Sequence, residues 1–357
     1  MTRWSSDVPR VTVVVVVYDT TAPRLQRCLQ SARSSNGVEV EVVVVDNASP
    51  RPVEAPLADR VLTRSVNGGF AAGVNDGVRA ATHPWIAVLN DDAVLEADAL
   101  RRCIDAIEAA GPSTVAAAPK VLFAGEEPPT IDSCGVVLRP SGEAFSAGAG
   151  EPDLGQFDTD DEALGPCMSA AVFRASAFRD VGPLDERYFL YYEDVDWALR
   201  CHLSGRRTVL VPTALAWHEH AASTRALGER RRFRMVQRNL LLCATANLSW
   251  ASLAVIWRQR VIAAAKAAVR GPDRTSLLMA IVAVLPRVPS ALMARRHRRR
   301  WVVRPDTDAF RFADGLEPFV DTTTYRPGPS QPAAAAARQR LARRGHGGDG
   351  EYHRQGL

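Results

Sequence analysis

The sequence predicts an α/β fold of the doubly wound type, in which a mostly parallel sheet is followed by a helical C-terminal extension. The β-branched runs "VTVVVVVY" at 11–18, "VEVEVVVVD" at 38–46 and "WIAVLNDD" at 85–92 are typical of strands buried on both faces. The segments 21–35 and 69–82 between these runs are predicted to be helices. A β-α-β succession of this kind aligns the strands in parallel and places ligands at their carboxyl ends.

The middle of the chain changes character before regular elements return. Residues 123–165 are rich in Gly, Pro and acidic residues and are predicted to form loops and short strands, including a hairpin at 131–146. Helices are then predicted near 169–180 and at 192–204, followed by a strand at 207–212.

Charge divides the chain near residue 227. Residues 1–227 hold 20 Lys and Arg against 31 Asp and Glu, whereas residues 228–357 hold 24 against 9. We expect 228–325 to be a basic helical region that contacts either an anionic membrane surface or a second copy of the chain. The biased segment 326–357 is expected to be a disordered tail. No nucleic-acid partner is expected, because the first part is acidic and the basic run lacks interleaved aromatic residues.

Composition sets the remaining bounds. With 357 residues, 46% of them apolar, the chain is long enough to bury a large core. The longest apolar runs, at 11–18 and 276–285, are shorter than the ~20 residues that cross a bilayer, so no transmembrane helix is predicted. The N-terminus has no signal-peptide pattern, and the six cysteines form no C-x-x-C pair. These features predict a cytoplasmic protein with reduced thiols, peripheral on the inner membrane face if the basic region binds lipid.

Two aspartates end the first two predicted strands. Asp19 follows the first strand in "VYDTTAP" and Asp46 ends the second in "VVDNASP". Each is explained equally well by an Asx turn or a helix N-cap. Their pairing favours a ligand site, because the carboxyl ends of parallel strands share one edge of the sheet.

A glycine-rich segment, "NGGFAAGVNDG" at 67–77, opens the second predicted helix. Its backbone N–H groups could approach a phosphate closely. It lacks the spacing of a dinucleotide fingerprint or a P-loop, and an ordinary helix N-terminus explains the glycines about as well.

Hard oxygen ligands follow the third strand. In "VLNDDAVL", the side chains of Asn90, Asp91 and Asp92 are of the type that binds Mg²⁺ or Mn²⁺, although a turn with an N-cap is the alternative. In "LAWHEHAAS", His218 and His220 lie on one side of an extended segment. Either histidine could join Asp92 in a mixed site, although a structural histidine is the more frequent case.

An acidic cluster lies among aromatic residues in "RYFLYYEDVDWALR" at 187–200. On a helix Glu193 and Asp196 are i, i+3 neighbours, whereas Asp194 projects about 100° away, so the three cannot share one role. We expect Asp196 to pair with an arginine such as Arg187 or Arg200. A partly buried carboxylate has a raised proton affinity, which suits a general base.

Taken in order, these motifs resemble the family-two inverting glycosyltransferases of the GT-A fold. The resemblance covers about 10–225 and is strongest to bacterial rhamnosyltransferase-like members that build cell-wall and surface polysaccharides. It implies a GT-A domain at 1–227, with a nucleotide-sugar half at 10–120 and an acceptor half at 121–227. The implied donor is a uridine or thymidine diphosphate sugar, with rhamnose as the suggested sugar. The implied acceptor is a hydroxyl of a glycan, either free or linked to a polyprenyl lipid.

The resemblance also assigns roles to individual residues. Tyr18 and Asp19 would line the nucleoside pocket, and Asp46 would contact the base. The glycine-rich turn formed by Asn67, Gly68 and Gly69 would lie near the nucleotide, with Asn75 on the helix that follows. Asn90, Asp91 and Asp92 would form the D-x-D-type motif, with Asp92 as metal ligand and with His218 or His220 binding the metal or the diphosphate. Asp194 would be the catalytic base, with Glu193 as the alternative. A non-catalytic nucleotide-sugar or glycan-binding module would keep the fold without needing Asp194.

Overall fold

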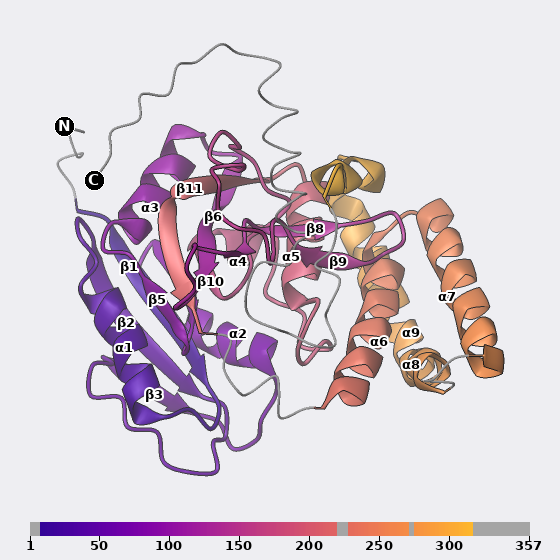
Figure 1. Ribbon diagram of the computed structural model, residues 1–357, viewed down its shortest axis with the longest axis horizontal. Helices are drawn as coiled ribbons and strands as arrows, with labels where there is room; N and C mark the ends of the chain where they lie inside the picture. The colour runs from indigo at the N-terminus through magenta and orange to yellow at the C-terminus, as the bar shows by residue number, and fades with distance from the viewer. Residues whose placement is uncertain (1–7, 220–227, 271–274, 317–357) are drawn as a thin grey trace.

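The structure is a computed structural model that describes residues 8–219, 228–270 and 275–316. Its centre is a nine-stranded sheet with the order β3-β2-β1-β4-β10-β6-β11-β5, in which β7 pairs with β6 (Figure 1). The first four strands of this order run parallel, β10 is antiparallel to both of its neighbours, and β6 and β11 are parallel to each other. The strands are β1 (Arg10–Val17), β2 (Glu39–Asp46), β3 (Arg60–Thr63), β4 (Trp85–Asn90), β5 (Ala93–Leu95), β6 (Thr114–Phe123), β7 (Ile131–Ser133), β8 (Val136–Leu138), β9 (Ala144–Ser146), β10 (Ala170–Arg174) and β11 (Arg207–His218).

Helices cover both faces of this sheet, as the sequence predicts for a doubly wound fold. Alternate side chains of β1 point to opposite faces, so that Val13 and Val15 pack with one group of helices while Val14 and Val16 pack with the other. The first group is α1 (Ala22–Arg33) and α3 (Ala99–Ala109), and the second is α2 (Phe70–Ala80), the short α4 (Ala177–Asp180) and α5 (Glu193–Leu203). The predicted fold class, a mostly parallel sheet with a helical extension, is confirmed.

Two glycines of the "NGGFAAGVNDG" segment allow α2 to approach β1 closely. A Cβ atom at Gly73 would lie 2.6 Å from Val16 Cγ1, and one at Gly77 would lie 2.2 Å from Val14 Cγ1. Such short distances force either the strand or the helix to move. The glycine content of this segment is therefore explained in part by helix–sheet packing.

The prediction of a helix near 169–180 is wrong. Ala170–Arg174 forms β10, which pairs with β4 on one side and with β6 on the other, and only Ala177–Asp180 is helical. Four of the five β10 residues are buried, because the strand lies at the centre of the sheet. The predicted hairpin at 131–146 is present in part, since β8 pairs with β9 whereas β7 joins β6.

The C-terminal part is helical, as predicted, and packs against α5 (Figure 1). It comprises α6 (Glu229–Asn247), α7 (Trp250–Arg270), α8 (Ser276–Val284), η2 (Leu285–Arg287), α9 (Val288–Arg298), η3 (Arg299–Trp301) and η4 (Asp306–Ala313). Leu240 and Leu241 of α6 share one hydrophobic core with Val195 and Leu199 of α5. The helical region is thus continuous with the α/β part. The predicted disordered tail at 326–357 lies outside the described residues.

The sequence predicts no transmembrane helix, but one helical segment of the structure is long and apolar enough to cross a membrane. Among the described residues, Ser276–Trp301 forms a 26-residue helical segment that, by length and composition alone, could cross a bilayer. Its most apolar window has a mean hydropathy of 1.9, and only 22% of that window is buried in the protein. A core helix of a soluble protein is buried far more completely, so the exposure of this segment calls for an explanation.

Candidate active site

The carboxyl ends of β1 and β2 meet, as the sequence predicts. Asn47 N donates a hydrogen bond to Val17 O at 2.9 Å, and Arg51 binds Asp19 at 2.6 Å across the two turns. Asp46 is 6% exposed, and its Oδ1 accepts a hydrogen bond from Ser49 N at 2.8 Å. Asp46 therefore stabilises the turn after β2 with one carboxylate oxygen, and its contact with a base stays a prediction.

The glycine turn before α2 is held in place by asparagines. Asn47 accepts a hydrogen bond from Gly68 N at 3.1 Å and donates one to Gly69 O at 2.9 Å, while Asn67 accepts one from Gly69 N. Gly69 has a φ of +85°, and a Cβ atom there would lie 2.2 Å from Phe189 O. Glycine is required at this position both for its conformation and for the close approach of the loop that precedes α5.

The remaining residues assigned to nucleotide binding differ in their surroundings. Tyr18 is 47% exposed beside the strand-end edge and is accessible to a ligand. Asn75 is buried, and its amide donates to Leu184 O and Glu186 Oε1 and accepts from Leu184 N. Because both of its N–H groups are used within the protein, Asn75 acts as a clamp on the loop before α5.

The metal motif brings together residues that are distant in sequence. His218 Nε2 lies 3.0 Å from Asp92 Oδ1 and 3.4 Å from Asn90 Nδ2, while His218 Nδ1 lies 2.8 Å from Asp132 Oδ2. Burial alone would lower the pKa of His218, but its hydrogen bonds to Asp132 and Asp92 raise that pKa to about 10. Burial, together with the charge of Asp92, raises the pKa of Asp91 to about 6. His220 lies outside the described residues.

This arrangement fits a divalent cation. Asp92 offers a carboxylate, and His218 offers an imidazole nitrogen on the same side once a bound cation displaces the proton of Nε2; Mn²⁺ and Mg²⁺ accept both kinds of ligand. Asp132 holds the other ring nitrogen, as carboxylates commonly do behind metal-binding histidines. Among the described residues no group of three His, Cys, Asp or Glu side chains could hold an ion. A cation here would therefore complete its coordination with diphosphate oxygens and water.

Glu193 and Asp194 begin α5, where the helix dipole favours negative charge. Glu193 is 6% exposed, and its Oε2 has no hydrogen-bond partner among the described residues. Burial, and then the charge of Asp194, raises the pKa of Glu193, and burial also raises the pKa of Asp194. Asp194 is the more exposed of the two, and its Oδ1 accepts a hydrogen bond from Val195 N at 2.8 Å.

The acidic pair lies close to the metal motif. Asp132 and Asp194 both raise the pKa of the Cys167 thiol after burial itself, so this thiol lies within electrostatic range of both carboxylates. Cys167 also lies 3.2 Å from the Ser169 hydroxyl, and Ser169 O accepts a hydrogen bond from Asn90 N at 3.0 Å. We therefore expect the strand-end residues and the start of α5 to share one site.

The loop before the acidic pair has an unusual backbone. Phe189, Tyr191 and Tyr192 have φ angles of +68°, +67° and +73°, a region that costs a side-chain-bearing residue about 1–3 kcal/mol. Asn239 of α6, which is fully buried, compensates by donating to three carbonyls of this loop, at 2.8–3.1 Å. Residues that maintain such a conformation next to titratable groups are typical of functional sites.

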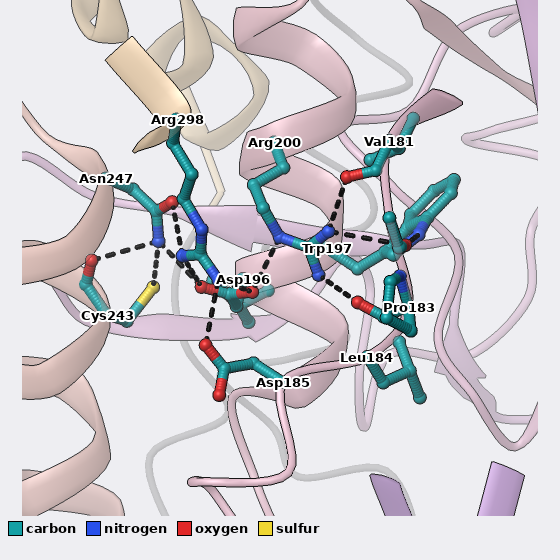
Figure 2. Close-up of polar contacts among 12 residues, drawn as sticks. Val181, Pro183, Leu184, Asp185, Asp196, Trp197, Arg200, Cys243, Asn247 and Arg298 are labelled. Atoms are coloured by element: carbon teal, nitrogen blue, oxygen red, sulfur yellow. Dashed lines mark hydrogen bonds and ion pairs between the residues drawn. The ribbon is translucent and has the colours of Figure 1, made fainter. Parts of the chain in front are cut away.

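Asp196 has the structural role that the sequence predicts, with one further partner (Figure 2). It is fully buried and binds Arg200 at 2.8 Å and Arg298 of α9 at 2.7 Å, and it also accepts hydrogen bonds from Asn247 and Tyr188. Burial would raise its pKa, but Arg298 and Arg200 hold the pKa of Asp196 well below its ordinary range. The C-terminal helices are thus ion-paired to the helix that begins with the acidic pair.

Three residues of this site were not singled out in the sequence: Asn47, Asp132 and Asn239. Asn47 follows directly on Asp46, so the rule that strand ends carry ligand-binding residues could have included it. Asp132 and Asn239 act through contacts that link distant parts of the chain, and no local pattern distinguishes them. Arg298 was expected near lipid head groups with the other arginines of its basic run, whereas the structure pairs it with Asp196.

The α/β fold and the gathered carboxylates agree with the resemblance that the motifs carry, and comparisons with known proteins identify the family. Residues 12–182 match the model of glycosyl transferase family 2. The fold resembles the crystal structure of GalNAc-T7 with UDP, GalNAc and Mn²⁺, with a TM-score of 0.58 and 10% identity over 87% of this chain and 58% of that one. Residues 12–182, just under half of the chain, thus match glycosyltransferase family 2, and the fold is of the GT-A type that the motifs imply.

Curated relatives are bacterial. The chain is 40% identical to the succinoglycan biosynthesis protein ExoO of Rhizobium meliloti, over 29% of this chain and 31% of that protein. It is 28% identical to the N-acetylglucosaminyl-diphospho-decaprenol L-rhamnosyltransferase of Mycobacterium tuberculosis, over 59% of this chain and 76% of that enzyme. The pre-mycofactocin glycosyltransferase of the same species is 30% identical over 62% of this chain and 45% of its own length. The chain thus spans less than two thirds of two of these three relatives.

Proposed function

We propose that this protein is a metal-dependent inverting glycosyltransferase. It would move a sugar from a uridine or thymidine diphosphate donor to a hydroxyl of a cell-wall or surface glycan. The observation that carries this proposal is the acidic pair at the start of α5, in which Glu193 is buried and Asp194 is half-buried, together with the strand ends that bear Asp92 and His218. A binding module has no use for buried carboxylates of raised proton affinity, because each costs stability when it is charged.

Each group of the site has a defined task in such a transfer. Asp194 would accept the proton of the acceptor hydroxyl as this oxygen attacks the sugar, and its raised pKa suits a general base. Asp92 and His218 would hold Mg²⁺ or Mn²⁺, which stabilises the charge that develops on the departing diphosphate. Asp132 would orient His218, and Tyr18 and Asp19 would lie beside the nucleoside.

The nature of the donor and acceptor is supported by the relatives. The mycobacterial relative is named for L-rhamnosyl transfer to a decaprenol-linked sugar, and the succinoglycan relative for the biosynthesis of a polysaccharide. By analogy, rhamnose is the proposed sugar and a polyprenyl-linked glycan is the proposed acceptor. The enzyme would then act at the cytoplasmic face of the membrane.

A two-stage experiment tests this function. A thermal-shift screen of nucleotide sugars with Mn²⁺ or Mg²⁺ first identifies the donor. Asp194→Asn should then reduce transfer and acceptor-free donor hydrolysis at least ~100-fold while leaving the dissociation constant of the donor within about threefold. Asp105→Asn, which changes a half-exposed carboxylate on α3, is the matched control and should behave as wild type.

The alternative function is a non-catalytic nucleotide-sugar or glycan-binding module. Donor binding without any hydrolysis or transfer by the wild-type protein would favour this alternative. Normal turnover by Asp194→Asn would instead remove Asp194 from the role of base, and the same assay on Glu193→Gln would show whether the neighbouring carboxylate has it.

A further inference from the structure

A stripe of exposed apolar side chains runs along α8 and α9. Its members recur at positions three, four and seven residues apart, so they lie on the same side of the helical segment Ser276–Trp301. Between 38% and 68% of each side chain is exposed, and the members are Leu278, Met279, Val282, Leu285, Leu292 and Met293. Soluble proteins rarely leave such a continuous apolar surface uncovered.

The neighbouring elements extend this surface at the end of the molecule that lies away from β3 (Figure 1). Helix α7 exposes Val255, Val261 and Ile262, while Trp250 and Trp301 are more than half exposed. Tryptophan is enriched where a protein meets the headgroup region of a bilayer.

The segment that contains α7, α8 and α9 is strongly basic. Residues 250–304 contain 12 Lys and Arg and a single acidic residue, Asp273. Arg258, Arg296, Arg299 and Arg300 are exposed. Exposed apolar side chains edged by cations are complementary to an anionic lipid surface.

We propose that α7, α8 and α9 form a monotopic membrane-docking face, which lies in the interface of an anionic bilayer. A second copy of the chain is a poor occupant of this face. A two-fold contact would bring two basic surfaces together with almost no acidic residues to neutralise them.

The packing of the segment also argues that it lies along the bilayer instead of crossing it. Arg298, near its end, is ion-paired with Asp185 and Asp196 of the α/β part, at 2.8 and 2.7 Å. Ser290 accepts a hydrogen bond from Arg187 at 3.3 Å, and α8 packs along α6. A helix that crossed the bilayer would have to break these contacts, whereas a helix in the interface keeps them.

This docking face has a consequence for the reaction that rests on the proposed function. The contact of Ser290 with Arg187 places the α8–α9 junction beside the loop that leads to Glu193 and Asp194. Docking would therefore hold the proposed base close to the bilayer, where the sugar of a polyprenyl-linked acceptor is exposed.

Vesicle flotation of the full chain tests the proposal without any sugar substrate. The protein should float with vesicles of 70% phosphatidylcholine and 30% phosphatidylglycerol at 50 mM NaCl. It should bind at least ~10-fold more weakly to pure phosphatidylcholine or at 500 mM NaCl. The double substitution Leu285→Glu and Met293→Glu should weaken binding to the anionic vesicles at least ~10-fold. The matched control is Val8→Glu with Val61→Glu, which changes two exposed valines outside the docking face and should bind as wild type.

Other outcomes would overturn the proposal. Equal binding by the two double variants, or no wild-type binding to anionic vesicles, would remove the docking face. Dimers that only Leu285→Glu with Met293→Glu disrupts would assign the face to a second copy, and protein that stays with vesicles at pH 11 would indicate a crossing helix. Unchanged thermal unfolding and donor binding would show that the double variant is folded. The docking face and the proposed function can therefore fail independently.

Discussion

The ion pair between Arg298 and Asp196 joins the C-terminal helices to the helix that begins with the acidic pair. Arg298 contacts both oxygens of Asp196, at 2.7 and 3.4 Å, and binds Asp185 at 2.8 Å and Asn247 at 2.9 Å. Asp196 is fully buried, so its charge depends on these partners for stabilisation. Arg298→Met would keep most of the side-chain volume and remove the charge.

The cost of this substitution can be worked from the contacts. Removing one partner of a buried ion pair costs about 3–5 kcal/mol, because the other charge is left uncompensated. Asp196 would keep Arg200, Asn247 and Tyr188 as partners, which places the expected loss near the lower limit. We therefore expect the free energy of unfolding to fall by about 3 kcal/mol, which corresponds to roughly 6–12 °C in the melting temperature.

Urea unfolding followed by circular dichroism at pH 7.5 measures this loss. Arg296→Met is the matched control, because it removes the same charge from an exposed position on the same helix and should cost at most about 0.5 kcal/mol. In a double-mutant cycle, Arg298→Met should cost less in the Asp196→Asn background than in the wild type. Equal stabilities of the Arg298→Met and Arg296→Met variants would refute the view that this ion pair stabilises the packing of α9 on α5.

Two further predictions concern the site itself. Glu193→Gln should raise the melting temperature by at least about 2 °C at pH 9 and change it much less at pH 5, because a carboxyl with a raised pKa in the folded protein costs stability progressively as pH rises from its unfolded-state pKa to its folded-state pKa. A constant difference between the two pH values in thermal scans would contradict this assignment. Asp132→Asn should weaken Mn²⁺ binding about 10–100-fold in calorimetry without substrate, because it removes the carboxylate behind His218. Asp153→Asn, on a neighbouring loop, is its control, and equal affinities in the two variants would exclude the orienting role of Asp132.

The sequence predicts the strands of the α/β half well because their burial is local in origin. Seven consecutive residues of β1, Val11–Val17, are buried, and only a strand covered on both faces needs such a run. β10 was predicted as a helix because its short alanine-rich stretch has no distinctive period. Its strand conformation comes from pairing with residues of β4 and β6 that lie more than 50 positions away in the chain.

The membrane-length segment 276–301 was missed for a related reason. Its apolar run, 276–285, ends just before Pro286 and is by itself too short to cross a bilayer. In the structure Pro286 and Pro289 each lie in the first turn of a new helical segment, where a missing N–H group costs little. The helical path therefore continues through both prolines.

Some residues of the candidate site could likewise be predicted from local sequence, whereas others could not. Asp92, His218 and Asp194 follow strand ends or open a helix, and the topology brings such positions to one edge of the sheet. Asp132 and Asn239 belong to the same site only because distant elements fold against it. Their residue types are common at protein surfaces, and only the structure shows that they are buried and bonded to the site.

The dependence of the site on α6 changes how the C-terminal helices are understood. The loop before Glu193 holds three side-chain-bearing residues at positive φ, and its carbonyls are bound by Asn239 while Gly69 packs against Phe189 from the other side. Neither contact alone accounts for this conformation, because the loop lies between the α/β half and the helical region. The helical region is therefore part of what positions the acidic pair, and a surface on α7, α8 and α9 that binds lipid would act on the same rigid body as the proposed base.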